Sequence, residues 1–358
     1  MNSGQKTLPC VKSVATALPA NYVSQELLSA ALRDFWNETG FKLETLERLH
    51  KATKVSGRYL ALPMEEYRSL DSFEKSNRAW MSIAPELAAE AARRALYTAR
   101  IRPQDVNHIF LVSGTGIATP SIDVRIISSL GMRPDLKRTP IFGLGCAGGA
   151  SGIAHAADYV RAFPDECALL IVVELCSLTL QPTDISVANQ IASGLFGDGA
   201  AAVVMFGAGR GDTGTPRVVA SRSIMYRDTE NVMGWRITDR GFRIVMSPDI
   251  PNIINQYIAQ DVDAFLREHG LERRQIRHWV AHTGGPKVLR SIEAGLELPS
   301  GALSRSWDSL DRVGNLSSAS VLFVFADLLQ ANEARPGDYG VMCALGPGFC
   351  LELVLLQW

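Results

Sequence analysis

Apolar, β-branched runs alternate with helical patterns along most of this chain, and that alternation restricts the possible folds more than any other feature of the sequence. Residues 107–112, 167–174 and 276–281 have the content expected of buried strands. Residues 147–163 and 251–269 have the pattern of helices. Strands and helices in this order predict an α/β protein whose helices cover the faces of its sheets.

Other segments give more specific expectations. A proline suits the first turn of a helix, so a helix is expected over residues 85–98, beginning at the proline. A hairpin-like strand pair is expected between residues 200 and 225, where a glycine-rich turn separates two apolar runs. A second strand pair, within residues 339–356, is expected to close the chain.

The glycine-rich stretch near residues 207–215 is the expected boundary between two halves, residues 1–208 and 209–358. A chain of 358 residues is long enough for one large domain or two of ordinary size. Each half would end in one of the two strand pairs, which predicts a duplicated architecture although no repeat is recognisable residue by residue. The halves are expected to share one interface.

Charge and composition exclude several classes of protein. The chain has 36 basic and 37 acidic residues, so it lacks the basic surplus of a nucleic-acid-binding protein. Residues 1–20 lack the pattern of a secretory signal, and no apolar run is long enough for a transmembrane segment. The six cysteines show no Cys-x-x-Cys spacing, so no metal site is expected. These features predict a cytoplasmic protein with free thiols.

The segment around Cys146 is the first candidate for chemistry. It runs from a short strand through a glycine-rich turn into a helix. At such a junction the unpaired amides and the positive end of the helix dipole favour a thiolate, which is the nucleophilic form of cysteine. Cys146 is therefore a candidate nucleophile, although a small buried cysteine in a tight turn would explain the segment equally well.

The same turn also contains a Gly-x-Gly-x-x-Gly pattern, at Gly143, Gly145 and Gly148. A second strand follows and ends in Glu174, which resembles the fingerprint of dinucleotide-binding proteins. This pattern alone is weak, but it leaves an NAD-dependent oxidoreductase as an alternative from a different class of enzyme.

Two further residues lie at comparable junctions. His282 follows the strand of residues 276–281 and precedes a glycine turn where a proline opens a helix. Asn315 lies in another glycine turn that enters a helix, where it could equally serve as a helix cap. A cysteine with two such donors suits thiolate chemistry in which developing negative charge is stabilised.

With these residues in view, the chain resembles the type III polyketide synthases of the chalcone synthase superfamily. The blocks that carry the resemblance follow the family's order and spacing: Phe142-Gly-Leu-Gly-Cys-Ala-Gly-Gly149, Leu195-Phe-Gly-Asp-Gly-Ala-Ala201, His282-Thr-Gly-Gly-Pro-Lys287, Gly314-Asn-Leu-Ser-Ser318 and Gly346-Pro-Gly348. The block that begins at His282 distinguishes this family from the β-ketoacyl-carrier-protein synthases, which usually have Gln-Ala-Asn after this histidine.

The resemblance implies a five-layered αβαβα thiolase fold with two pseudo-repeated halves, and a homodimer. It also implies catalytic roles for three residues. Cys146 would carry the acyl group of a starter CoA thioester, and the histidine would hold its thiolate as an ion pair. His282 and Asn315 would stabilise the enolate that forms when malonyl-CoA loses carbon dioxide. No cofactor is expected, because acyl-CoA and malonyl-CoA are substrates.

The resemblance also places residues around the substrate. Phe196 aligns with a gatekeeper between the CoA tunnel and the cavity, and Ile244 occupies the position of a second gatekeeper that is usually phenylalanine. Arg48 matches a basic residue at the tunnel mouth. The remaining positions expected to line the cavity are mostly small: Gly114, Thr115, Thr119, Cys176, Thr179, Ala192 and Ser317.

Small cavity residues are expected to leave an apolar tunnel for an aliphatic chain, as in bacterial alkylpyrone and alkylresorcinol synthases. Each buried methylene contributes about 0.8 kcal/mol, so such a tunnel would favour long starters. The expected product is an alkylpyrone or alkylresorcinol made from a medium- to long-chain acyl-CoA and malonyl-CoA. An acyl-carrier protein is an alternative carrier of the starter. The other readings are a β-ketoacyl-carrier-protein synthase III and a non-catalytic acyl-binding protein.

Overall fold

The computed structural model describes residues 8–36, 43–210 and 215–358, and nine of its strands form one continuous sheet whose two parts, the first and second sheets, are joined at one end. Cys10 lies opposite Arg217 where the sheets join. The first sheet has the strand order β5 (Lys137–Ile141), β4 (His108–Val112), β6 (Cys167–Leu175), β7 (Asp198–Phe206) and β1 (Cys10–Ala17). The second has the order β8 (Arg217–Met225), β13 (Cys350–Gln357), β12 (Tyr339–Gly346) and β11 (Ile276–Ala281).

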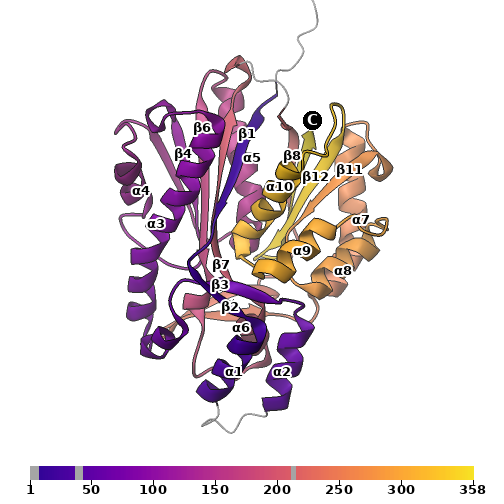
Figure 1. The fold of residues 1–358 in the computed structure, drawn as a ribbon. Coiled ribbons are helices and arrows are strands. Elements are labelled where there is room, and N and C mark those ends of the chain that lie inside the picture. Colours follow the sequence, from indigo (N-terminus) through magenta and orange to yellow (C-terminus); the bar gives the residue numbers. More distant parts are fainter. Residues whose placement is uncertain (1–7, 37–42, 211–214) are drawn as a thin grey trace, which may run out of the picture.

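Helices form three layers around and between these sheets (Figure 1). The outer face of the first sheet packs against α3 (Phe73–Ala99) and α4 (Asp123–Leu130). The space between the sheets is filled by α5 (Gly148–Ala162) and α10 (Ser320–Ala331). The outer face of the second sheet packs against α7 (Ile250–Glu268), α8 (Pro286–Gly295) and α9 (Ser304–Val313). This is the five-layered αβαβα arrangement expected from the resemblance.

The two sheets repeat one topology. In the first, β4 and β6 are parallel and β7 returns antiparallel to β6. In the second, β11 and β12 are parallel and β13 returns antiparallel to β12. The central helices α5 and α10 each lead into the middle strand of these sets, so the duplicated architecture is confirmed.

The predicted strand pair between residues 200 and 225 is wrong. Both strands form, but β7 pairs with β1 and β6, whereas β8 pairs with β13. The first strand of the chain occupies the edge of β7 that a hairpin would have used. The glycine-rich stretch therefore carries the chain from one sheet to the other.

The predicted start of the helix at residue 85 is also wrong. The helix α3 begins at Phe73, where the Ser72 side chain caps it by accepting a hydrogen bond from the backbone N–H of Lys75. Pro85 therefore lies inside the helix and cannot donate to the carbonyl of Met81. Arg125 replaces the missing donor, because its Nη1 lies 2.7 Å from that carbonyl oxygen.

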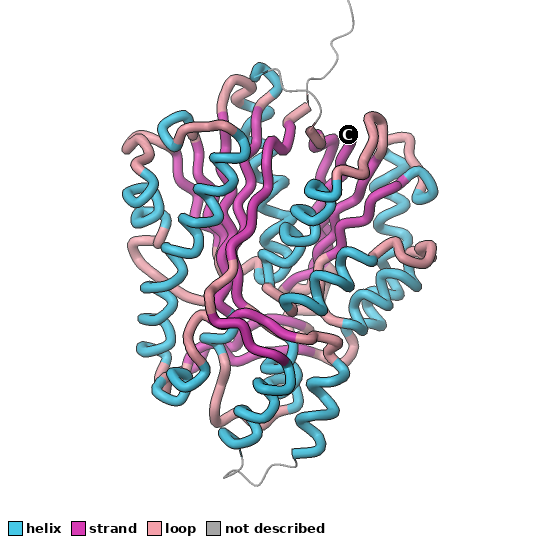
Figure 2. Tube along the Cα trace, in the orientation of Figure 1, coloured by secondary structure: helices cyan, strands magenta, loops and turns pink. Residues whose placement is uncertain are grey.

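A smaller region lies below the sheets in Figure 1 and encloses one end of the molecule. It contains the strand pair β2 (Asn21–Ser24) and β3 (Gly57–Leu60) and the hairpin of β9 (Met233–Thr238) and β10 (Gly241–Met246). Its helices are α1 (Gln25–Trp36), α2 (Leu43–Ala52) and α6 (Val187–Leu195). Figure 2 shows the same strands crossing beneath the long strands of the sheets. Among the described residues, no helix combines the length and apolar character needed to span a membrane.

Candidate active site

Cys146, His282 and Asn315 line one small cavity of about 50 Å³ between the two halves of the fold. They come from three loops: the turn before α5, the residue after β11, and the turn between α9 and α10. The structure thus brings together the three residues for which the sequence predicts catalytic roles.

Cys146 lies in a short 3-10 turn, Gly145–Ala147, directly before α5. Its side chain is 8% exposed, and its Sγ lies 3.7 Å from the hydroxyl oxygen of Ser317. Burial raises the pKa of the Cys146 thiol to about 12, against the opposing effect of the Ser317 hydroxyl. The resting cavity therefore favours the thiol.

His282 is held by its backbone, whose N–H donates to the carbonyl oxygen of Cys343 at 2.9 Å. Its imidazole is almost fully buried, and its Nδ1 has no hydrogen-bond partner among the described residues. Burial lowers the pKa of His282 to about 3. The resting geometry thus favours a neutral imidazole beside a thiol, which differs from the expected thiolate–imidazolium pair. A neutral imidazole still offers one N–H to a ligand.

The backbone of Asn315 is fixed on both sides by the end of α6. Its N–H donates to the carbonyl of Leu195, and its own carbonyl accepts from the N–H of Gly197, at 2.9 and 3.0 Å. The side-chain Oδ1 accepts from the backbone N–H of Ser317 at 2.8 Å. With Oδ1 used in this way, the amide has its Nδ2 hydrogens to offer to a ligand in the cavity.

Glu174, the acidic residue of the dinucleotide-binding interpretation, is fully buried and already engaged. Its carboxylate accepts from the backbone N–H of Gly114 at 3.0 Å, from the Thr115 hydroxyl at 2.9 Å and from the Ser318 hydroxyl. Burial raises the pKa of Glu174 to about 7. A carboxylate enclosed in this way cannot bind a ribose.

The glycines of the same pattern are also used inside the protein. Of the pattern's glycines, a Cβ at Gly145 would lie 2.7 Å from the ring of Pro347, and one at Gly148 would lie 2.7 Å from the side chain of Val112. At the next residue, Gly149, a Cβ would lie 2.2 Å from the carbonyl oxygen of Ser318. These glycines let α5 approach the segment before α10 closely. The dinucleotide interpretation is therefore wrong about the acid and about two of its three glycines, Gly145 and Gly148.

A larger, mostly apolar cavity of about 530 Å³ adjoins the cavity of Cys146. Three of the predicted cavity residues, Cys176, Thr179 and Ala192, line it. Phe196, Trp235 and Ile244 line both cavities, so these three side chains form the partition between them. Trp235 was not predicted to line a cavity, although it lies on β9 directly opposite Ile244 on β10. The apolar side chains in the lining of the large cavity include Leu28, Ala31, Leu32, Leu60 and Met64.

The other predicted cavity residues are distributed differently. Ser317 lines the cavity of Cys146. Gly114 and Thr115 bind Glu174 instead. Neither is among the described residues that line these two cavities. Thr119 is exposed on the surface of the single chain.

Arg48 is exposed on α2. A wide groove nearby is lined by other basic residues, Arg33, Lys51, Lys54 and Arg290, together with acidic ones. Arg48 is not part of that lining within the described chain. The structure thus places the basic neighbours of Arg48 in the groove and Arg48 outside its lining, and the role of this region as a tunnel mouth stays a prediction.

Comparison with known proteins places the chain in a family. The model of the N-terminal domain of chalcone and stilbene synthases matches residues 2–210, and the model of their C-terminal domain matches residues 217–358. The chain belongs to the type III polyketide synthases.

Individual relatives agree with this assignment. A 1,3,6,8-tetrahydroxynaphthalene synthase of Streptomyces peucetius is 47% identical to this polyketide synthase over 97% of its chain and 93% of the relative. A putative chalcone synthase of Bacillus subtilis is 37% identical over 97% and 98% of the two chains. The crystal structure of the 1,3,6,8-tetrahydroxynaphthalene synthase of Streptomyces coelicolor has a TM-score of 0.91 with 30% identity, covering 98% of this chain and 99% of that one.

Family membership makes this polyketide synthase a transferase with a thiolase fold. It also decides against two of the alternatives that the sequence left open, the NAD-dependent oxidoreductase and the β-ketoacyl-carrier-protein synthase III.

Proposed function

We propose that this polyketide synthase condenses an aliphatic acyl-CoA starter with malonyl-CoA and that Cys146, His282 and Asn315 carry the reaction. The observation that carries the proposal is the apolar cavity of about 530 Å³ beside the cavity of Cys146. An alkyl chain attached at Cys146 could extend into it past the partition of Phe196, Trp235 and Ile244. Its lining of leucine, alanine and methionine side chains suits methylene groups.

The first chemical step loads the starter. The Cys146 thiol passes its proton to His282, and the sulfur attacks the thioester carbonyl of the acyl-CoA. The carbon–sulfur bond to CoA breaks, and the CoA thiolate leaves and takes up a proton. Loading is therefore coupled to proton transfer, which fits a pair that is neutral at rest.

The second step extends the chain. Malonyl-CoA loses carbon dioxide, and the electron pair of the broken carbon–carbon bond forms an enolate. The N–H of His282 and the Nδ2 hydrogens of Asn315 donate to the enolate oxygen. The enolate carbon attacks the Cys146 thioester, and the sulfur leaves as the new carbon–carbon bond forms. Because decarboxylation generates the carbanion, no separate strong base is needed.

Two or three extensions followed by ring closure would give an alkylpyrone or an alkylresorcinol. A second candidate product is a tetrahydroxynaphthalene built from malonyl units alone. The 47% identity to a 1,3,6,8-tetrahydroxynaphthalene synthase favours this second candidate. Polar groups in the large cavity, among them Tyr67, Ser177 and Asn189, could hydrogen-bond to such a chain of ketones.

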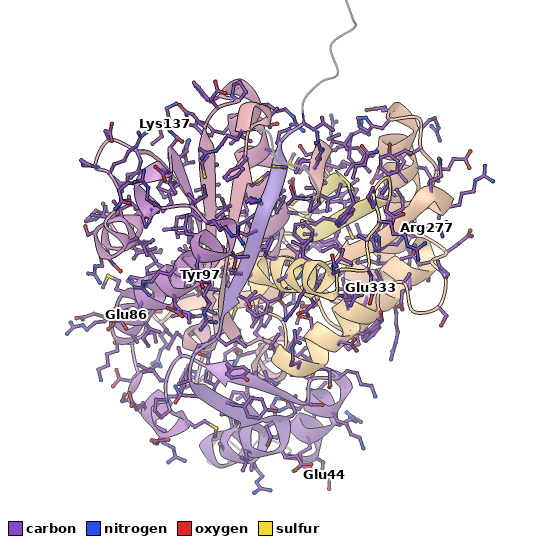
Figure 3. All side chains as sticks on the ribbon, turned by 45° about the horizontal axis from the view of Figure 1, so that its top comes forward. Glu44, Glu86, Tyr97, Lys137, Arg277 and Glu333 are labelled. Atoms are coloured by element: carbon purple, nitrogen blue, oxygen red, sulfur yellow. The ribbon has the colours of Figure 1, made fainter. Side chains whose placement is uncertain are left out.

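We also propose that the enzyme works as a homodimer. The strand β5 is the end strand of its sheet, and Phe142, which follows it, is 51% exposed. Figure 3 places Lys137, the first residue of β5, at the margin of the molecule. A second copy covering this edge could bring its own exposed Thr119 toward the cavity, which would reconcile the predicted role of Thr119 with its position. CoA would approach along the groove lined by Lys51 and Lys54, and a carrier protein is an alternative donor there.

The test is to incubate the purified enzyme with malonyl-CoA alone and with acyl-CoAs of graded length, and to identify the products by mass spectrometry. The proposal expects pyrones or resorcinols whose masses increase with the starter, and their loss in Cys146→Ala. A matched control is Cys343→Ala, because Cys343 is an equally buried thiol on β12 that lines neither cavity.

Malonyl-CoA alone giving a tetrahydroxynaphthalene would select the second candidate. Acyl-CoA binding without any adduct on Cys146 would instead support the non-catalytic acyl-binding protein.

A further inference from the structure

Arg58 on β3 is fully buried, and its guanidinium points at the end of α6. Nη1 donates to the carbonyl oxygens of Ser193 and Phe196 at 3.0 and 2.9 Å. Nη2 donates to the carbonyl oxygen of Gly194 at 2.6 Å and to the side-chain oxygen of Gln25. Three carbonyls in the last turn of α6 and its C-cap thus bond to a side chain from another element.

The physical reason lies in the helix end itself. The last carbonyls of a helix have no partners within it and form the negative end of the helix dipole. The last turn of α6 has no basic residue of its own. Arg58 supplies the cation, and the planar guanidinium reaches several carbonyls at once, as a lysine ammonium cannot. The side chains of Gln25 and Thr53 add donors to the carbonyl of Gly194, at 2.9 and 3.1 Å.

The segment that Arg58 holds also holds the candidate active site. Leu195 and Gly197, on either side of Phe196, bond to the backbone of Asn315 at 2.9 and 3.0 Å. The carbonyl between them, that of Phe196, bonds to Arg58. The segment is therefore fixed between the guanidinium on one side and Asn315 on the other. The ring of Phe196 meanwhile forms part of the partition between the two cavities.

We propose that Arg58 is a positioning residue that sets both the partition at Phe196 and the placement of Asn315. This role rests on the proposed function, since it assigns a cause to the geometry of that same site. Arg58 lies in the lining of the large cavity, and its guanidinium donates to the end of α6, through which the positioning acts. Its removal should allow the segment of residues 195–197 to shift, which would move the Phe196 ring and the Asn315 amide together.

The variants are Arg58→Met, which removes the donors, and Arg58→Lys, which keeps the charge but reaches fewer carbonyls. The matched control is Arg273→Met, because Arg273 donates at 2.6 Å to the carbonyl of Leu296, which follows the end of α8, away from the cavities. Thermal unfolding of all three variants would show what each loses in stability.

The decisive measurement is the ratio of triketide to tetraketide products from one acyl-CoA, together with kcat for malonyl-CoA decarboxylation. Because displacement by about 1 Å can reduce a rate by two orders of magnitude, Arg58→Met is expected to lower kcat at least about tenfold. In Arg58→Met the product ratio is also expected to change about threefold. Arg58→Lys should give values between those of Arg58→Met and the wild type. A variant that is only less stable would lose active enzyme without changing the product ratio, and Arg273→Met is expected to behave in that way.

An unchanged product ratio and kcat in folded Arg58→Met would overturn the proposal. If that variant does not fold, Gln25→Met removes one partner of the guanidinium. The same reasoning then requires smaller changes in kcat and in the product ratio, in the same direction. The alkylation rate of Cys146 by N-ethylmaleimide should rise in these variants as the partition loosens. This rate needs no turnover, so it tests the positioning role even if the wild-type enzyme makes no polyketide and the proposed function fails.

Discussion

At Cys146, burial and hydrogen bonding act on the thiol in opposite directions. Burial disfavours the thiolate, whereas the Ser317 hydroxyl 3.7 Å away and the start of α5 favour it. Burial is the larger effect, so the pKa of the thiol is raised to about 12. The reactive thiolate must then form as substrate binds, rather than being present in the resting enzyme.

The pH dependence of alkylation tests this account. Because the thiolate fraction rises with pH up to the pKa of about 12, iodoacetamide should modify Cys146 faster at each pH from 6 to 9, by about tenfold per unit. Labelling of Cys146 would be followed by mass spectrometry, with Cys146→Ala as the background. A rate that reaches a plateau near neutral pH would show instead that His282 already holds the thiolate as an ion pair.

Glu174 gives a second prediction at this scale. Its pKa is raised from 4.5 to about 7 by burial, so the folded protein resists ionisation of this carboxyl. The stability that this group contributes is fully present below pH 4.5 and is lost as the pH rises through about 7. The free energy of unfolding of the wild type, relative to Glu174→Gln, should therefore fall between pH 4.5 and 7.5, by up to about 3 kcal/mol.

Denaturant titrations of both proteins across that pH range would measure this difference. The comparison cancels other titrating groups, among them Asp198, whose pKa burial raises to about 6. Parallel stability profiles for the two proteins would contradict the account.

Single residues were predictable where a local pattern carried the signal. Cys146, His282 and Asn315 stand in short blocks beside turns, and the sequence was sufficient to predict that these three come together in one site. Arg58 and Trp235 were not predicted as site residues, because the contacts that make them important are with carbonyls and side chains far away in the sequence. Gly114 and Thr115 were expected to face substrate, but both are used by Glu174, a contact that no local pattern reveals.

Among the elements, α3 shows how a local rule can be overridden. Proline favours a helix start, but the Ser72 cap and a long alanine face that packs on the first sheet carry the helix through Pro85. The carbonyl left without a donor, that of Met81, is then satisfied by Arg125. The strand pair expected between residues 200 and 225 failed for a similar reason. The edge of β7 is taken by β1, which is separated from it by nearly the whole first half of the chain, and local sequence patterns do not reveal so distant a pairing.

The bond between Arg125 and Met81 can be tested with a double-mutant cycle. Arg125→Met should lower the free energy of unfolding by about 1 kcal/mol, the usual worth of one hydrogen bond. In a Pro85→Ala background, residue 85 regains its N–H and can donate to Met81, so the same change should have little effect. Denaturant unfolding of the four proteins gives both values. Equal losses in the two backgrounds would show that Arg125 acts through other contacts.

For the whole molecule, the layered order of helices and sheets followed from the alternation in the sequence and from the family blocks. The large cavity followed only in part: Cys176, Thr179 and Ala192 were predicted to line a substrate cavity, but its walls also combine α1, β3, α6 and the hairpin of β9 and β10, which are distant in sequence. The exposed edge at β5 likewise appears only once the strand order is known.

The proposed dimer gives a prediction at this scale. Phe142→Asp would place a charge on the exposed edge beside β5 and should convert a dimer into monomers, as measured by sedimentation velocity. Tyr97→Asp is the matched control, because Tyr97 on α3 is 86% exposed and lies away from this edge. A wild type that sediments as a monomer, or two variants that behave alike, would count against this edge as the interface.

The position of β1 has a consequence for the order in which the protein can assemble during its synthesis. The ribosome makes β1 first, but its partner β7 ends at Phe206, so the first sheet can close only after more than half of the chain has emerged. The second sheet begins with β8, at Arg217, and needs the final strand, β13. The Cys146 loop is made while His282 and Asn315 are still unmade, and residues that it packs against, among them Ser317 and Pro347, are made later still. A nascent chain in that state carries the nucleophile without the donors, and the cavity is completed only when the last residues are in place.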